Sequence, residues 1–284
     1  MRVARRLLAP LLPLLLGACS PTGIANALTP RGGIAPQEGL AYGLLPRQRL
    51  DLYLPPGRPE APLVVFFHGG GWRSGARGDY AFLARVLVQQ GLAVAVPDYR
   101  LWPAARWPDF LEDAALAVAW LRARPDFATR PVFLMGHSAG GFLAAALALD
   151  PTWLGEASRV TLAGGVLLAA PIAWQPLDEP SRSIFAPAPG GRIEAAPDPA
   201  ALATAPPMLL LHGEADDVVY PLHATNLAAA MTSAGRPVRL RTYPGMGHVG
   251  VLAAMAAPVR ALGLAGAPVL AEVTDFLADP MREA

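Results

Sequence analysis

The chain has 284 residues, of which 23 are basic and 22 acidic, so its net charge is +1 near neutral pH. Nucleic-acid-binding proteins usually carry a basic face, and this balance therefore predicts no nucleic-acid partner. The single cysteine excludes an intrachain disulfide and a cysteine-based zinc site. A composition that is 53% hydrophobic and 16% charged indicates a globular protein rather than general disorder.

The beginning of the chain has the pattern of an export signal. Three arginines within the first six residues precede an apolar run over residues 7–16, and two small residues then stand before Cys19. A charged start, an apolar stretch and small residues at a cleavage site are typical of a secretory signal peptide. The apolar run is too short to span a bilayer and contains two prolines, so we expect no permanent transmembrane helix here.

The segment Leu16-Gly17-Ala18-Cys19 resembles the bacterial lipoprotein box. That resemblance implies removal of residues 1–18, lipidation of Cys19 and anchoring in the cell envelope, with the outer membrane facing the periplasm as the expected location. Residues 19–40 are rich in Gly, Pro and small residues, which predicts a tether, and the folded domain is expected over residues 41–284. An ordinary signal peptide followed by an unrelated cysteine remains an alternative.

From residue 41 onward, short apolar runs alternate with longer helical patterns. Residues 49–54 alternate in polarity, which predicts a half-exposed strand, whereas continuous apolar runs predict strands that are buried on both faces. The further strands are expected at residues 62–67, 92–96, 132–135, 166–169, 208–211 and 238–242, and the helices at 79–90, 109–124, 138–149, 222–234 and 268–278. This alternation favours a mostly parallel, doubly wound α/β sheet.

The segment 171–206 interrupts the alternation, because it contains many prolines and shows no clear period. A long stretch of this kind in a compact domain is usually a functional insertion such as a lid, or a mobile loop. We expect its conformation to shape any binding pocket nearby.

The sequence Gly136-His137-Ser138-Ala139-Gly140 lies between a buried strand and a helix, and this context turns a G-x-S-x-G pattern into a nucleophile elbow. The turn is too sharp for side chains at its two flanking positions, which explains both glycines. Ser138 is therefore predicted to project from the carboxyl edge of the sheet as a nucleophile. A structural glycine-rich turn is the alternative.

A serine hydroxyl needs a base, and the base needs an acid that orients it. His248 follows the strand near residue 242 and is the predicted base. Asp216 is the predicted acid, in preference to its neighbours Asp217 and Glu214. Of the remaining histidines, we expect His68 to hold its own loop, His137 to contact substrate, His212 to support the acid loop and His223 to lie at the surface.

The run His68-Gly69-Gly70-Gly71-Trp72 follows the strand at 62–67, and glycines there let backbone N–H groups turn toward a ligand. Attack on a carbonyl creates an alkoxide that needs such donors, and we assign this oxyanion hole to Gly70, Gly71 and Ala139. Trp72, His137 and Trp174 are candidates for the substrate pocket. Asp98 and Arg100 are expected to form a structural pair at the end of a strand.

These motifs together resemble the α/β-hydrolase superfamily of serine esterases over about residues 41–280. HGGG resembles the hormone-sensitive-lipase-like branch, but His137 stands where that branch commonly has Asp, and the acid loop lacks its Asp-Pro-Leu pattern. Asp216-Asp-Val-Val-Tyr-Pro221 and Asp98-Tyr-Arg-Leu101 look closer to the feruloyl-esterase-like and arylformamidase-like carboxylesterases. The resemblance implies an α/β-hydrolase fold, a small or aryl ester as the substrate and no metal or organic cofactor.

Three other functions remain open. An N-formyl amide is an alternative substrate, because the arylformamidase-like branch is one of the resemblances. A serine peptidase of the same fold is less favoured, since it usually carries an extra recognition domain. A non-catalytic binding lipoprotein is also less favoured, because such proteins generally lose a member of the Ser-His-Asp set.

Overall fold

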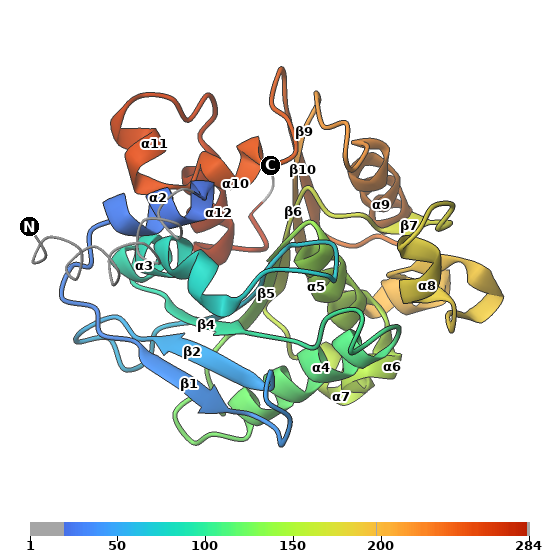
Figure 1. Cartoon of the computed structure of the whole chain (residues 1–284), viewed down its shortest axis with the longest axis horizontal. Coiled ribbons are helices and arrows are strands. Elements are labelled where there is room, and N and C mark those ends of the chain that lie inside the picture. Colours follow the sequence, from blue (N-terminus) through green and yellow to red (C-terminus); the bar gives the residue numbers. More distant parts are fainter. Residues whose placement is uncertain (1–19, 197, 283–284) are drawn as a thin grey trace, which may run out of the picture.

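The computed structural model describes residues 20–196 and 198–282. Its centre is an eight-stranded sheet with the strand order β1-β2-β4-β3-β5-β6-β9-β10, and helices cover both faces (Figure 1). All neighbouring pairs from β4 to β10 are parallel, whereas β1 and β2 are antiparallel to their neighbours. The prediction of a mostly parallel α/β sheet is confirmed.

The continuous apolar runs form the central strands, and every residue in five of these strands is buried, as predicted for strands covered on both faces. They are β3 (Leu63–Phe67), β4 (Ala93–Pro97), β5 (Val132–His137), β6 (Gly164–Leu168) and β9 (Met208–Gly213). The outer parallel strand, β10 (Val238–Tyr243), is half-buried over most of its length.

The strand predicted as half-exposed is instead buried from its second residue onward. It forms β2 (Arg49–Tyr53) and pairs on its two sides with β1 (Gln37–Ala41) and β4. Asp51 interrupts the apolar pattern, yet it is buried because its carboxylate accepts hydrogen bonds from the Arg77 side chain and from the N–H of Gly39. The polar residue at position 51 therefore indicates an ion pair with Arg77 and not an exposed face of the strand.

Two apolar layers separate the sheet from its helices. Leu63, Val65 and Phe67 of β3 pack in one layer, while Val64 and Phe66 pack in the other. The first layer contains α4 (Asp109–Arg122), α5 (Ala139–Leu149) and α9 (Leu222–Ser233). The second contains α2 (Pro21–Leu28), α3 (Ala81–Gln89), α10 (Gly250–Ala253), α11 (Ala257–Ala261) and α12 (Val269–Ala278). The long predicted helices are all present with shifted ends.

The segment expected as a tether differs from the prediction over its described part, because it forms α2 and most of β1. Asn26 holds α2 to the domain: its side-chain amide donates to the carbonyl oxygens of Gly78 and Asp79, and its Oδ1 accepts from the N–H of Phe82. These partners lie far away along the chain, so the composition of the segment alone could not reveal them. The predicted signal peptide and Cys19 lie outside the described residues.

The Pro-rich insertion consists of short, packed elements. They are β7 (Ala173–Trp174), α8 (Ser181–Phe185), η2 (Pro189–Gly191), β8 (Ile193–Glu194) and η3 (Pro199–Thr204), and β7 pairs with β8 in a separate sheet. Ile184, Phe185 and Ile193 are buried in the same layer as α5. The insertion therefore joins the main core, while three further short elements lie elsewhere: η1 (Arg77–Tyr80), α6 (Pro151–Leu154) and α7 (Glu156–Arg159).

Candidate active site

The carboxyl ends of parallel strands meet at one edge of a sheet, and four loops that carry the predicted residues begin there. The glycine run follows β3, the G-x-S-x-G turn follows β5, the acidic loop follows β9, and the His248 loop follows β10. These loops come from strands that neighbour one another or are separated by only one strand in the sheet. The sheet order therefore explains how distant parts of the sequence can meet.

The turn after β5 is sterically constrained. Ser138 has φ 54° and ψ −123°, a left-handed conformation that is rare for a residue with a side chain. A Cβ on Gly136 would lie 2.1 Å from the carbonyl oxygen of Gly140, and a Cβ on Gly140 would lie 2.1 Å from that of Phe67. Only glycine fits at these two positions, and the turn thereby holds Ser138 at the first turn of α5.

Ser138 lies at the end of a hydrogen-bonded chain of three side chains. Its Oγ lies 2.9 Å from Nε2 of His248, and Nδ1 of His248 lies 2.8 Å from Oδ2 of Asp216. Because a carboxylate can only accept here, Nδ1 carries a proton and Nε2 of the neutral ring is left to accept from the serine. The structure thus brings together the nucleophile, base and acid that the sequence predicts.

Asp216 is held as a buried carboxylate. Its Oδ1 accepts hydrogen bonds from the N–H groups of Val218 and Val219, at 3.0 and 2.8 Å. Burial alone would raise the pKa of this carboxyl, but the N–H of Val219, the His248 ring and the N–H of Val218 outweigh it and hold the pKa below its ordinary value. Asp216 is therefore negatively charged in the folded protein near neutral pH.

The other two acids of this loop have different surroundings. Asp217 is exposed, and Glu214 accepts a hydrogen bond from the hydroxyl of Thr242 on the neighbouring strand. The geometry therefore favours Asp216 as the partner of His248, as the sequence predicted.

His137 has a different position from the one expected for a pocket residue. It is buried, its Nε2 lies 3.1 Å from the carbonyl oxygen of His248, and the two rings are 4.9 Å apart. Burial, together with the nearby His248, lowers the pKa of His137 to about 4, so its ring is neutral and donates Nε2–H to that carbonyl. We interpret His137 as a support for the His248 loop rather than as a contact for substrate.

The remaining histidines also hold loops. Nε2 of His212 lies 2.8 Å from the carbonyl oxygen of Val219 and 3.2 Å from Oδ2 of Asp216, which agrees with its expected support of the acid loop. Nδ1 of His68 hydrogen-bonds the carbonyl oxygen of Gly69, so His68 holds its own loop as predicted. His223 was expected at the surface, but it is half-buried and its Nδ1 accepts from the N–H of Ile172 at 3.3 Å.

The glycine run lies directly against the elbow. A Cβ on Gly69 would be 3.4 Å from Cβ of Ser138, and the N–H of Gly69 donates to the hydroxyl of Tyr80. Gly70 and Gly71 have φ values of 119° and 59°, and a Cβ on Gly70 would lie 2.2 Å from the carbonyl oxygen of Ser74. The loop therefore needs glycine both for its backbone angles and for its close packing.

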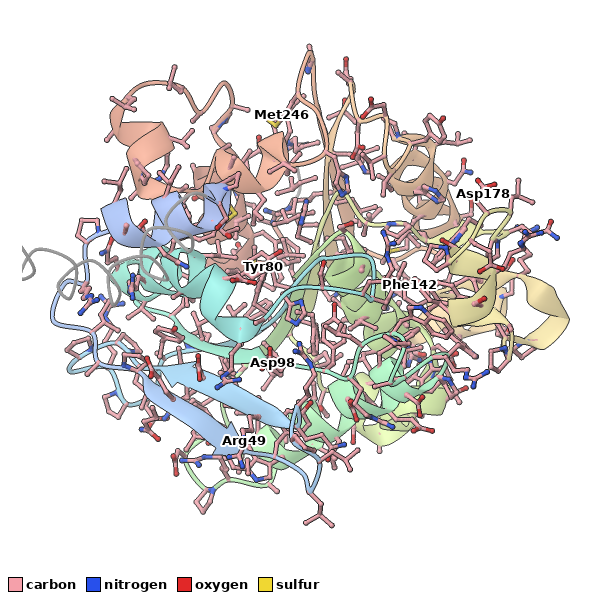
Figure 2. The ribbon with its side chains drawn as sticks, in the orientation of Figure 1. Arg49, Tyr80, Asp98, Phe142, Asp178 and Met246 are labelled. Atoms are coloured by element: carbon pink, nitrogen blue, oxygen red, sulfur yellow. The ribbon has the colours of Figure 1, made fainter. Side chains whose placement is uncertain are left out.

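An ion-pair network beneath this loop replaces the predicted pair of Asp98 and Arg100. Asp98 instead binds Arg77 through both its oxygens, lies within 3.4 Å of the Arg47 guanidinium, and is 3.7 Å from Nε2 of His68. Tyr80 and Asp98, both labelled in Figure 2, are buried. Their nearness in the chain made Asp98 and Arg100 look like partners, but the strand end directs the two side chains to different places.

Arg100 pairs with acids of the following helix. Its guanidinium binds Asp113 at 2.9 Å and Asp109 at 2.9 Å, which fixes the loop before α4. The prediction that Arg100 is structural agrees with this position, although its partner was wrong.

Comparisons with known proteins show what this chain is similar to. The BD-FAE family matches residues 50–155, and the prolyl oligopeptidase family matches residues 191–261. Esterase LipC of Mycobacterium tuberculosis is 31% identical over 73% of this chain and 58% of its own length. Kynurenine formamidase of Danio rerio is 31% identical over 48% of this chain and 46% of its own. The chain thus spans about half the length of these curated relatives.

Solved structures settle the architecture. Thermogutta terrifontis esterase 2 superposes with a TM-score of 0.68 at 23% identity, covering 88% of this chain and 96% of that one. The strand order, the elbow after β5 and the order of Ser138, Asp216 and His248 along the chain agree with that likeness. The chain has the α/β-hydrolase fold. Within it, Ser138 lies at the strand-to-helix turn after β5, where a G-x-S-x-G motif is found in this fold.

Aromatic side chains gather around Trp72, the last residue of the glycine run, in this α/β-hydrolase fold. Trp72 stacks on Trp174 with ring centroids 5.6 Å apart, and Phe142 and Phe185 meet Trp72 edge-on at 5.9 and 4.8 Å. Trp72 is buried and Trp174 is half-buried. The insertion thereby covers the glycine loop with Trp174 and Phe185, and the two predicted tryptophans lie together at its contact with the core.

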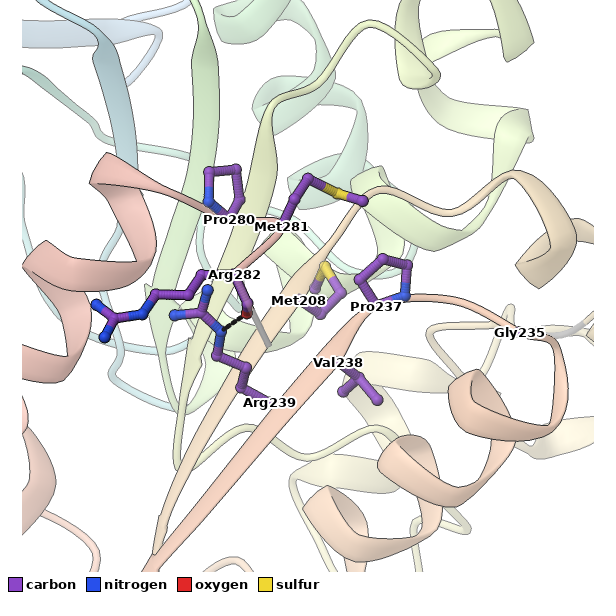
Figure 3. Close-up of a pocket in the computed structure, with 8 residues that line it drawn as sticks. All are labelled: Met208, Gly235, Pro237, Val238, Arg239, Pro280, Met281 and Arg282. Carbon is purple, nitrogen blue, oxygen red and sulfur yellow. Dashed lines mark hydrogen bonds between the residues drawn. The ribbon is translucent and has the colours of Figure 1, made fainter. Parts of the chain in front are cut away.

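A different hollow lies at the opposite edge of the α/β-hydrolase sheet (Figure 3). Its volume is about 390 Å³, and its lining includes Met208 and Val238, the first residues of β9 and β10. Nε of Arg239 donates there to the carbonyl oxygen of Arg282. Ser138 lies at the other end of the strands, so this cavity is separate from the candidate active site.

Two residues that support the site, Arg77 and Tyr80, are not marked by any motif in the sequence. Arg77 links Asp51 and Asp98 from the η1 segment, and nothing in its local sequence marks it as an anchor of the glycine loop. The hydroxyl of Tyr80 accepts a hydrogen bond from the N–H of Gly69. Hydrophobic periodicity around 79–90 predicts the helix, but it carries no information about these polar contacts.

Proposed function

We propose that the protein is a serine carboxylic ester hydrolase that acts on small or aryl esters through an acyl-enzyme on Ser138. The observation that carries this proposal is the hydrogen-bonded chain of Asp216, His248 and Ser138 at a strained elbow. The relatives named as esterases support the same chemistry. Because the match covers only 58% of Esterase LipC, the substrate is proposed from this chain's own residues.

In the first half-reaction, Oγ of Ser138 bonds to the ester carbonyl carbon while Nε2 of His248 takes the hydroxyl proton. Asp216 holds the ring and stabilises the imidazolium that forms. The tetrahedral intermediate then breaks its bond to the alcohol oxygen, which leaves with the proton from His248. In the second half-reaction, water adds to the acyl-enzyme in the same way and releases the acid and free Ser138.

The negative oxygen of each intermediate needs N–H donors, and we assign these to Gly70, Gly71 and Ala139. Gly69 is unsuitable because its N–H already binds Tyr80. The positive φ of Gly70 and Gly71 turns the loop beside the elbow, and Ala139 is the first residue of α5. Each donor contributes about 10²–10³-fold in rate in enzymes where one has been removed.

Replacement of the nucleophile tests the proposal. We expect Ser138→Ala to lower kcat for nitrophenyl acetate by about 10⁴-fold or more, because no other hydroxyl lies within reach of His248 in the described geometry. Ser233→Ala, which changes an exposed serine at the end of α9, is the matched control. A fluorophosphonate should label Ser138 in the unaltered chain, as seen by peptide mass spectrometry. Full activity in Ser138→Ala would overturn the proposal.

An N-formyl amide is a second candidate substrate. The similarity to kynurenine formamidase favours it, since acyl transfer from an amide uses the same three side chains. Parallel measurement of kcat/KM for nitrophenyl esters of increasing acyl length, an N-formyl arylamine and a peptide separates these classes. A preference for the formyl amide by about tenfold or more would replace the ester assignment, while leaving Ser138 as the nucleophile.

For localisation, we propose that the protein is exported and anchored through a lipid on Cys19, in the outer membrane facing the periplasm. The basic start, the apolar run and the Leu16–Cys19 motif support this. In the described part of the chain, no helix has the length and apolar character required to cross a membrane. Cys19→Ser should move the mature protein from the membrane fraction to the soluble fraction, and unchanged fractionation would contradict the anchor.

A further inference from the structure

An unusual group of exposed apolar side chains lies where the chain emerges from its predicted signal. Ile24 and Leu28 of α2 are 48% and 60% exposed, and Leu262 and Leu264 after α11 are 71% and 69% exposed. Helices α2 and α11 contact each other and lie side by side in Figure 1. We call these four side chains the α2–α11 apolar surface.

The exposure of this surface is not a consequence of a loosely attached helix. Asn26 is bonded to Gly78, Asp79 and Phe82, and Ala25 is buried in the layer beneath α2. Residues four apart share one face of a helix, so Ile24 and Leu28 form an outward stripe while their neighbour Ala25 faces the core. The fold thus holds two large aliphatic side chains in water at a fixed place.

The surrounding sequence has very few charges. Residues 20–31 and 249–271 contain only two charged side chains, Arg31 and Arg260, and both are exposed and basic. Contiguous exposed apolar surface usually marks a contact with a protein or a membrane. Exposed apolar side chains accompanied by arginines suit the acyl chains and anionic headgroups of a phospholipid surface.

The position of the N-terminus identifies which contact is involved. Cys19 directly precedes Ser20, the N-cap of α2, so a lipid on Cys19 would enter the bilayer beside the first turn of this helix. With α2 held to the domain, only a few rotatable bonds separate the anchor from Ile24. A membrane that holds this lipid would therefore lie close to Ile24 and Leu28 of the α2–α11 apolar surface.

We propose that the α2–α11 apolar surface lies in the headgroup region of the phospholipid bilayer and fixes the orientation of the domain on the membrane. This proposal rests on the proposed lipid anchor. Lipid chains supply attachment, while the four aliphatic side chains and the two arginines restrict rotation of the domain. The remaining exposed surface, including the loop at Leu44, then faces the aqueous compartment.

Site-directed fluorescence tests the proposal on the full lipidated chain. Because Cys19 is the single cysteine and its thiol carries the lipid, Leu264→Cys or Ile24→Cys provides one free thiol for an environment-sensitive fluorophore such as NBD. The chain is reconstituted into phosphatidylcholine vesicles with or without phosphatidylglycerol. Leu44→Cys, at a fully exposed leucine in the loop between β1 and β2, is the matched control.

We expect the labels at 264 and 24 to show blue-shifted emission and at least about fivefold slower quenching by aqueous iodide than the label at 44. Leu262→Glu combined with Leu264→Glu should abolish this protection at position 24. Equal quenching at 264 and 44 in both vesicle types would overturn the proposal. Protection without vesicles would also overturn it, since a second copy or the chain's own first residues would then cover the surface.

A failed anchor gives a different result. If Cys19 is not lipidated, the unaltered chain itself takes up the fluorophore at that thiol. The surface is then tested by sedimentation of the unaltered chain with vesicles, where the double Glu variant should bind at least about tenfold more weakly. No difference between these two chains would overturn the surface assignment independently of the anchor.

Discussion

Two buried aspartates at the same edge of the sheet have different partners and different roles. Asp98 follows β4 and binds the guanidinium groups of Arg77 and Arg47. Asp216 follows β9 and binds the imidazole rings of His248 and His212, together with two backbone N–H groups. The two residues share their type, their position after a strand and their burial. Their different roles must therefore come from their partners.

Arginine is charged at every pH at which the protein folds, so the charge of Asp98 is permanently compensated. Histidine can gain and lose a proton near neutral pH, so the charge of Asp216 remains available to stabilise an imidazolium when one forms. The first aspartate is therefore suited to holding the glycine loop, whereas the second is placed to stabilise a protonated His248 ring. Variants that remove one charge at a time test this distinction.

The largest effect is expected from Asp216→Asn. The amide keeps the size of the side chain but can no longer hold Nδ1 of His248 as a donor, and we expect kcat to fall by about 10⁴-fold with KM little changed. Asp217→Asn, one residue further along the loop, should keep kcat within about threefold. Steady-state ester hydrolysis measures both, and the reverse ranking would assign the acid to Asp217.

A smaller effect, on stability rather than on chemistry, is expected from Asp98→Asn. This change removes the counter-charge of Arg47 and one of the two carboxylates that pair with Arg77, the other being Asp51. We expect the free energy of unfolding to fall by about 1–3 kcal/mol. Asp178→Asn is the matched control, because Asp178 lies exposed in the insertion at the rim of the molecule (Figure 2). Urea denaturation gives the two free energies. A loss of kcat at Asp98 as large as that at Asp216 would erase the distinction.

The same contrast explains how much of the site could be predicted. Ser138, His248 and Asp216 could be predicted from the sequence for two reasons. The elbow needs residues without a side chain, which are seen as Gly136 and Gly140, and the fold fixes the order of the three residues along the chain. The ion-pair network of Asp98 could not be predicted from the sequence. Its arginines come from the β1–β2 loop and from η1, and local sequence does not report which side chains meet across a sheet.

The errors of the fold prediction have the same origin. The β2 strand was expected to be half-exposed because Asp51 is polar, but Arg77 lets that carboxylate remain buried. Likewise, the apparent tether becomes α2 through Asn26 and its distant partners. Periodicity and turn residues predict where elements lie, whereas polar contacts between distant segments need the three-dimensional arrangement.

The smallest expected effect is a pH dependence of stability that originates in both clusters. Burial lowers the pKa of His68, beside Asp98, and of His137, beside His248, from 6.5 to about 4. Between these pH values the unfolded chain binds protons that the folded chain does not, so the folded state loses stability as the pH falls from about 6.5 toward about 4. Asp216 acts only at lower pH, because its stabilising charge is lost below its ordinary pKa of 3.8.

Each of these histidines should contribute about 1.4 kcal/mol per pH unit over the middle of this window. We therefore expect His137→Phe and His68→Phe each to reduce the slope of unfolding free energy against pH between pH 6 and pH 5, whatever their stability at pH 7. Urea unfolding at several pH values measures this slope. A loss of packing caused by the substitution lowers the free energy of unfolding equally at every pH, so it does not change the slope. If His137→Phe left the slope unchanged while His68→Phe reduced it, the ring beside His248 would be protonated in the folded protein. It would then place a positive charge against an imidazolium at His248, and the neutral support assigned to His137 would be wrong.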